Sequence, residues 1–166
     1  MNRDSLLKLN KLFNYVIAAL ILVMFITFAL PYFNYAGGEQ ETISIWGYLG
    51  FPAKFEQMED LLSVKFVTIK QLNVVLAIIV AGIISIITLL TKKGMATQLF
   101  PLIWAVWGTI GYFKNGFLKL GNTSARPIQI VVVLVTLAVV IVNIVLYTLE
   151  LKSRTASDYM DLDAWS

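Results

Sequence analysis

The sequence contains no cysteine and no histidine. Without cysteine there can be no disulfides, thiol nucleophiles or thiolate metal sites, and without histidine the chain lacks imidazole ligands and the usual proton carrier near neutral pH. It also lacks a Gly-rich phosphate loop, a nucleophile elbow and a metal-binding motif. We therefore expect a protein that is not an enzyme and that has no metal site and no cofactor.

Charged residues are scarce, at 14% of the chain, and hydrophobic residues make up 58% of it, with a mean hydropathy of +0.78. An ordinary soluble domain is roughly 25% charged. The net charge of +3 is small and no basic stripe is present, so no nucleic acid partner is expected. Loops without disulfides fit a bacterial cell surface better than a eukaryotic one, which favours a bacterial source.

Long apolar runs are abundant instead. The run from Ile128 to Leu149 contains no charged residue, and as a helix it would be about 33 Å long, enough to cross the hydrocarbon layer of a membrane. Three similar runs precede it. The sequence therefore predicts an all-α integral membrane protein, a four-transmembrane-helix bundle with spans at residues 12–33, 72–90, 95–113 and 128–149.

The basic residues predict how the chain is threaded. Arg3, Lys8 and Lys11 precede the first run and favour a cytoplasmic N-terminus. A signal peptide is the alternative, but residues 12–33 are longer than a typical signal core and lack a small-x-small cleavage site. An even number of spans places residues 150–166 in the cytoplasm as a tail. We expect a multi-pass protein of the cell membrane with both termini inside.

Residues 34–70 form the longest segment between the predicted spans. Alternating polar and apolar residues at 42–46 resemble a short strand. After Pro52, the apolar side chains recur at helical spacing, so we predict a short amphipathic helix at 51–66 that caps the outer ends of the bundle. Its apolar stripe is Phe51, Phe55, Met58, Leu62 and Phe66, with Trp46 and Tyr48 expected beside it.

Two spans carry patterns that suggest contact faces. Ala77, Ala81 and Ser85 form a small-xxx-small ladder, which lets another helix approach closely, either within the protein's own bundle or from a partner. In the third span, Pro101 marks a kink or the start of the helix. Trp104, Trp107 and Gly111 share one helical face by spacing, which would give an aromatic groove or simply packing against lipid and neighbouring helices.

Four spans with a long first outer loop and a short second one resemble the arrangement of claudin-like proteins, and Ile45-Trp46-Gly47-Tyr48-Leu49 is similar to the aromatic-glycine loop of that group. That family's loop is held by a cysteine pair, which this chain lacks. We interpret the resemblance as shared topology and not as family membership.

The spans contain no Asp, Glu, Lys or Arg, the residues that mark ion paths and proton relays. By exclusion, the sequence favours an accessory or assembly subunit, in the bilayer, that binds another integral membrane protein or itself as a homo-oligomer. The alternative is a small oligomeric transporter or channel for a neutral or apolar solute. The predicted partner-binding residues are Trp46, Tyr48, Phe55, Met58, Ala77, Ala81 and Ser85, and the groove of the alternative would comprise Trp104, Trp107, Gly111 and Asn143.

Overall fold

The computed structural model describes residues 3–37, 39–50, 69–91, 94–114, 116–119 and 121–163. The predicted amphipathic helix at 51–66, with Phe55 and Met58, lies outside the described residues. In chain order the elements are α1 (Arg3–Thr27), β1 (Pro31–Gly37), β2 (Glu39–Ser44), α2 (Ile45–Gly50), α4 (Ile69–Thr91), the 3-10 helix η1 (Met95–Gln98), α5 (Leu99–Lys114), α6 (Gly116–Lys119) and α7 (Ala125–Asp163).

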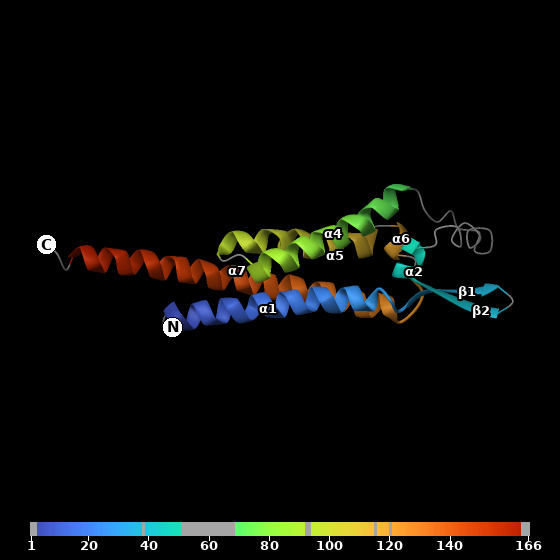
Figure 1. Cartoon of the computed structure of the whole chain (residues 1–166), viewed down its shortest axis with the longest axis horizontal. Helices are drawn as coiled ribbons and strands as arrows, with labels where there is room; N and C mark the ends of the chain where they lie inside the picture. Colours follow the sequence, from blue (N-terminus) through green and yellow to red (C-terminus); the bar gives the residue numbers. More distant parts are fainter. Residues whose placement is uncertain are drawn as a thin grey trace.

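The four long helices lie side by side and alternate in direction along the chain (Figure 1). Helix α1 contacts α7 and α4, and α5 contacts α4 and α7, so each helix has two neighbours around a common core. Both termini lie toward one end, here called the terminal end, and β1 and β2 project from the other, the hairpin end (Figure 1). The arrangement is a four-helix bundle with an up-and-down order.

Buried positions in the long helices recur at alternating spacings of three and four residues. A mean repeat of about 3.5 residues is that of left-handed helix packing, with neighbours crossing at about 20°. The repeat comprises Asn10, Asn14, Ile17, Ile21 and Met24 in α1, Val75, Ile78, Gly82, Ser85 and Leu89 in α4, Thr97, Pro101, Trp104, Gly108 and Gly111 in η1 and α5, and Gln129, Val133, Thr136, Val140, Asn143, Tyr147 and Glu150 in α7.

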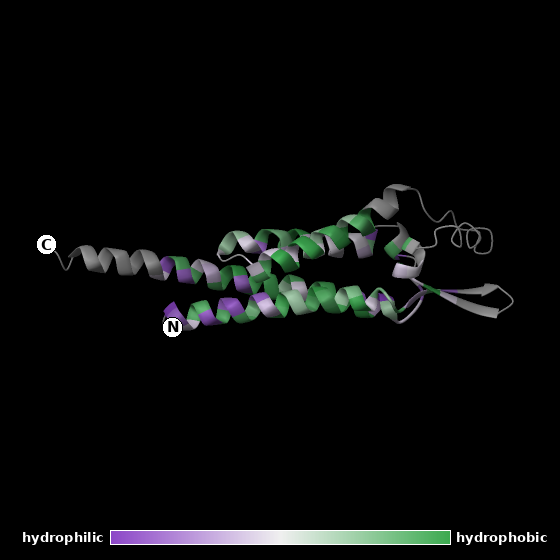
Figure 2. Cartoon of the chain, viewed as in Figure 1, coloured by the Kyte–Doolittle hydropathy of each residue, from purple (hydrophilic) through white to green (hydrophobic). Residues whose placement is uncertain are grey.

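Three segments are long and apolar enough to cross a membrane: Arg3–Thr27, Val74–Thr91 and Ala125–Ser153. Their outward faces carry exposed aliphatic side chains such as Ile26 and Val131, and the middle of each helix is mostly hydrophobic (Figure 2). A mostly helical chain with three such segments is consistent with the all-α membrane protein predicted from the sequence. Helix α5 has 16 residues and is shorter.

Helix α1 differs from the predicted span at 12–33 at both ends. It is already helical at Arg3, well before the predicted start at residue 12, and Leu6 and Asn10 face the bundle. It ends at Thr27, where a tighter turn follows, in which the N–H of Leu30 donates to the Thr27 carbonyl at 3.1 Å. Pro31 has no N–H to donate and cannot continue the helix. The chain then enters β1, so Tyr32 and Phe33 belong to a strand.

Helix α7 continues to Asp163, whereas the sequence was interpreted as leaving the last span near Leu149 for a tail. No proline or glycine interrupts residues 150–163, so nothing in the backbone chemistry stops the helix there. Glu150 remains buried against the bundle. The polar segment after the apolar run is therefore a helical extension.

Strands β1 and β2 form an antiparallel hairpin with an irregularity between Pro31 and Phe33. Successive side chains in a regular strand point to opposite faces, but an extra residue in one strand re-aims its neighbour. Tyr32 and Phe33 are accordingly both buried, with their rings edge to face at 4.9 Å. The strand interpreted at 42–46 is found in part, since β2 covers Glu39–Ser44 and α2 begins at Ile45.

Candidate functional sites at the two ends of the bundle

The base of the hairpin is held by the segment that precedes α7. The N–H of Asn34 donates to Asn122 Oδ1, and Asn122 Nδ2 donates to the Asn34 carbonyl, both at 2.7 Å. The N–H of Asn122 reaches the Tyr32 carbonyl at 3.2 Å, and the Thr123 hydroxyl donates to the Pro31 carbonyl. Asn122 thus completes one edge of β1 in the way a neighbouring strand would.

Tyr32 anchors β1 inside the bundle. Its hydroxyl donates to the Leu118 carbonyl at 2.5 Å. Burial raises the pKa of the phenol well above its ordinary value, because loss of solvation disfavours the phenolate. Its ring leaves no room at Gly121, where an added Cβ would lie 2.5 Å from two ring carbons. Gly121 is therefore required by the ring of Tyr32.

Trp46, a predicted partner-binding residue, fastens α2 to the end of α1. Its Nε1 donates to the Phe25 carbonyl at 2.8 Å, and its backbone N–H donates to the Phe28 carbonyl at 3.2 Å. Its ring meets those of Phe25 and Phe28 edge-on at 6.4 and 5.7 Å. The ring is still 39% exposed, so Trp46 is both a structural link and part of the outer surface. Only the backbone of Tyr48, in α2, is described.

Gln129 links three elements just inside the hairpin end. Its Nε2 donates to the Thr27 carbonyl at 3.0 Å, and the same carbonyl accepts the N–H of Leu30 in the turn where α1 ends. Its Oε1 accepts the Tyr112 hydroxyl at 2.7 Å. The end of α1, the last turn of α5 and the start of α7 are therefore fixed to one another by a single buried amide.

A second buried polar cluster lies toward the terminal end, around Asn14. The Oδ1 of Asn14 accepts from Gln98 Nε2 and from Asn143 Nδ2, both at 2.8 Å, and its Nδ2 donates to the Tyr147 hydroxyl at 3.2 Å. Helices α1 and α7 and the 3-10 turn η1 meet at this one side chain. We call Asn14, Gln98, Asn143 and Tyr147 the Asn14 cluster.

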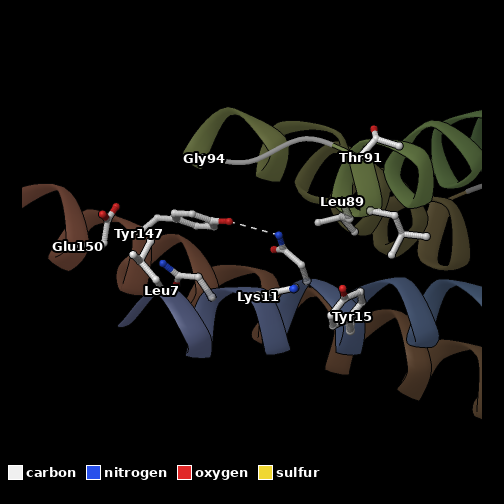
Figure 3. A pocket seen from close by; sticks show the side chains of 11 residues that line it. Leu7, Lys11, Tyr15, Leu89, Thr91, Gly94, Tyr147 and Glu150 are labelled. Carbon is white, nitrogen blue, oxygen red and sulfur yellow. Dashed lines mark hydrogen bonds between the residues drawn. The ribbon is translucent and has the colours of Figure 1, made fainter. Parts of the chain in front are cut away.

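A cavity of about 340 Å³ adjoins the Asn14 cluster on the side of the terminal end. Figure 3 shows its side chains coming from α1, from the end of α4 with Gly94, and from α7. Glu150 is only 2% exposed, and Arg3 Nε lies 3.7 Å from its Oε1. The cavity is lined by Leu7, Asn10, Lys11, Asn14, Tyr15, Leu89, Leu90, Thr91, Gly94, Tyr147 and Glu150.

Burial increases along the small-residue ladder of α4, from Ala77 to Ser85. Ala77 is exposed, Ala81 is partly buried against the core, and Ser85 is fully buried, with its hydroxyl donating to the Ala81 carbonyl at 2.6 Å. Neighbouring side chains lie close to α4 at Gly82, where an added Cβ would be 2.9 Å from Trp104 Nε1 and 2.5 Å from the Phe25 ring. The small residues of α4 thus serve the protein's own packing at Gly82 and Ser85 and leave Ala77 on the surface.

The structure does not bring the four predicted groove residues together on one surface. Trp104 is fully buried in the core, whereas Trp107 is 48% exposed on the outside of α5. Gly111 packs near Leu118 and Ile78 toward the hairpin end, and Asn143 belongs to the Asn14 cluster. Trp107 follows Trp104 by three positions, and in this helix that step leads from the inner face to the outer.

Five polar residues of the terminal end were not predicted as a site: Asn10, Asn14, Gln98, Tyr147 and Glu150. A signal for them exists in α7, where the buried polar residues Gln129, Thr136, Asn143 and Glu150 follow one another at intervals of seven. That interval places them on a single buried stripe of a left-handed bundle. Asn10 and Asn14 lie one turn apart on the matching face of α1.

No protein-family model, curated protein or solved structure matches this chain.

Proposed function

We propose that this protein is a non-enzymatic accessory or assembly subunit of a larger membrane complex, and that its hairpin end binds another integral membrane protein. The observation that carries the proposal is the hairpin itself. Its base is fixed to the bundle through Tyr32, Asn34 and Trp46. Its far half extends beyond the ends of the helices (Figure 1).

A projecting hairpin on a fixed base suits binding. The backbones of Tyr35 and Glu41, Ala36 and Gln40, and Gly37 and Glu39 pair with each other, so each strand keeps an outer edge of N–H and carbonyl groups. Such an edge can accept a strand from another protein. A base held by side-chain and backbone hydrogen bonds lowers the ordering cost of that contact.

The alternative is a small oligomeric transporter or channel for a neutral or apolar solute. It has less support, because the core between the cavity and the hairpin end is filled by Ile17, Ile21, Met24 and Trp104, all fully buried. A solute path would need these side chains to separate. The accessory role needs no such movement.

The complex can be tested by gentle detergent extraction from the native membrane and native mass spectrometry. We expect a fixed stoichiometry with one larger, heterologous membrane protein, lost when residues 35–41 are replaced by a two-residue turn. Removal of residues 158–166, an extension at the opposite end, is the matched control and should leave the complex intact. Recovery only as a homo-oligomer, with solute flux in vesicles that a Trp104 substitution abolishes, would establish the transporter instead.

The proposal places four spans in the cell membrane of a bacterium, with both termini in the cytoplasm. Besides α1, α4 and α7, the remaining span would be η1 together with α5, which is the third span in chain order. The two are continuous from Met95 to Lys114 and together reach about 32 Å. It runs antiparallel to α4 and packs between α4 and α7. Arg3, Lys8 and Lys11 then lie inside, as the positive-inside rule favours.

Single cysteines test this topology, because the natural chain has none. We expect an impermeant maleimide to label cysteines at Gly37 and Ser124 in intact cells, and cysteines at Lys93 and Ser157 only after lysis. Ser124 is exposed and is preferred to Gly121, where a side chain would collide with the Tyr32 ring. Labelling at Lys93 but not at Gly37 in intact cells would invert the topology.

A further inference from the structure

The cavity beside the Asn14 cluster lies where three helices change from apolar to polar. On α1, Lys11 is the last charged residue before the apolar run. Helix α4 ends at Thr91, just before Lys92 and Lys93 in the sequence. On α7, Glu150 is the first charged residue after the run that ends at Leu149. If these helices cross a membrane, the cavity lies at the boundary between hydrocarbon and water.

The wall of the cavity is continuous with the apolar surface of the bundle. Leu7, Tyr15 and Leu90 line it and are also 40, 50 and 53% exposed. Figure 3 shows Leu7 and Tyr15 on α1 and Leu89 on α4 around the same space. An occupant with an apolar part could therefore reach from the cavity into the surrounding lipid without crossing a polar rim.

The interior of the cavity offers polar groups that the protein itself does not use. Asn10 is 2% exposed, yet neither its Oδ1 nor its Nδ2 has a hydrogen-bond partner among the residues that the structure describes. A buried amide without a partner is unfavourable, because it has lost its hydrogen bonds to water and gained none in return. Asn10 lines the cavity one turn before Asn14, so a polar group in the cavity would satisfy both its donor and its acceptor.

Two lining side chains of opposite charge define the class of occupant. Lys11 supplies an ammonium and Glu150 a carboxylate, and both line the same space (Figure 3). Arg3 approaches one oxygen of Glu150 at 3.7 Å, and a carboxylate can accept several further hydrogen bonds. A purely anionic molecule would meet Glu150 as well as Lys11, whereas a zwitterion would meet a complementary charge at each.

We propose that this cavity binds the headgroup of a phospholipid that carries a primary ammonium beside its phosphate, as in phosphatidylethanolamine. Glu150 accepts hydrogen bonds from the ammonium, Lys11 pairs with the phosphate, and Asn10 bonds the polar ester region. The acyl chains leave past Leu7, Tyr15 and Leu90. A volume of about 340 Å³ is within the range of small-molecule pockets.

Lipid binding to the full-length protein in mild detergent, resolved by native mass spectrometry, tests the proposal. We expect one phosphatidylethanolamine bound about tenfold more tightly than phosphatidylcholine, whose quaternary ammonium has no N–H to donate, and more tightly than phosphatidylglycerol, which has no ammonium. Glu150→Gln and Lys11→Gln should each remove this preference. Asp4→Asn and Lys8→Gln change charge at exposed positions near the same end that do not line the cavity, and should keep the preference.

Asn10→Leu is the second variant, in case the charge substitutions disturb folding. An apolar side chain of similar size removes the unpartnered amide and should not destabilise the bundle, but it should lower phosphatidylethanolamine affinity about tenfold. Unchanged affinity in Asn10→Leu, equal binding of the three lipids, or a preference for phosphatidylglycerol would each overturn the proposal. A competition experiment with phosphoethanolamine distinguishes a lipid from a soluble ligand. If phosphoethanolamine displaces the lipid at equal concentration, the cavity binds a soluble amino-phosphate and the proposed lipid ligand is wrong.

Discussion

Replacing Gly82 by leucine is expected to separate α4 from α1 and α5. The first added atom would already lie 2.5 Å from Phe25 and 2.9 Å from Trp104. Trp104 is fully buried and cannot move aside, and Phe25 packs against Trp46 and Phe28. Overpacking of this kind typically costs about 1–3 kcal/mol and occasionally more, and leucine at such a contact should be at or beyond the upper end. SDS-induced unfolding of the purified protein measures the loss.

Ala77→Leu is the matched control for Gly82→Leu, because Ala77 is on the same helix but exposed. It should leave the unfolding curve unchanged within about 0.5 kcal/mol. Gly82→Ala adds only the first atom and should cost less than Gly82→Leu. An unfolding curve of Gly82→Leu that overlays the unsubstituted protein would show that α4 does not pack against Trp104.

The second large effect is expected at Asn14, whose amide joins α1, α7 and η1. Asn14→Leu removes three hydrogen bonds and leaves the amides of Gln98 and Asn143 buried. Hydrogen bonds between membrane helices contribute about 0.6 kcal/mol on average and up to about 1.7. Each buried amide that loses its bond to Asn14 adds to this, although Gln98 Nε2 keeps a bond to the Thr97 hydroxyl at 3.2 Å. We expect a loss of about 2–4 kcal/mol in the same unfolding assay.

Two further variants test whether the loss of stability is specific to the Asn14 cluster or follows from removing any polar group. Thr88→Val removes a hydroxyl that, within the described part of the chain, bonds to the carbonyls of Ile84 and Ser85 in its own helix. The change should be nearly neutral. Combining Asn14→Leu with Gln98→Leu and Asn143→Leu should recover part of the loss, because the stranded partners are then removed as well. A triple variant no more stable than Asn14→Leu would mean that side-chain volume, and not hydrogen bonding, dominates there.

The membrane character of this chain was predictable because hydropathy is a property of each segment alone. The uncharged run ending at Leu149 and its counterparts in α1 and α4 needed no knowledge of their neighbours. The hairpin was not predictable in the same way. Tyr32 and Phe33 look like aromatic residues at a membrane interface, and their place in a strand depends on Asn122 and Leu118, far along the chain.

The terminal end of the bundle shows the same dependence on residues that are distant in the sequence. The seven-residue interval from Gln129 to Glu150 could have predicted a buried polar stripe on α7. Its partners on α1 and η1, Asn14 and Gln98, are fixed only once the helices are packed. The cavity is harder still to predict from the sequence, because it is the space left between three helices after they pack. Trp107 was grouped with Trp104 because spacing alone cannot say where the boundary of a buried face falls.

The proposed accessory role requires that the hairpin end contact a protein partner. Site-specific photo-crosslinking in living cells tests it, with a photoreactive residue at Ala36 or Gln40 in the hairpin, or at Val80 on the exposed face of α4 as the control. We predict that both hairpin positions crosslink the heterologous membrane protein found by native mass spectrometry, at its fixed stoichiometry, and that Val80 does not. Crosslinks from the hairpin to other copies of this chain alone, or to no protein, would contradict the accessory role.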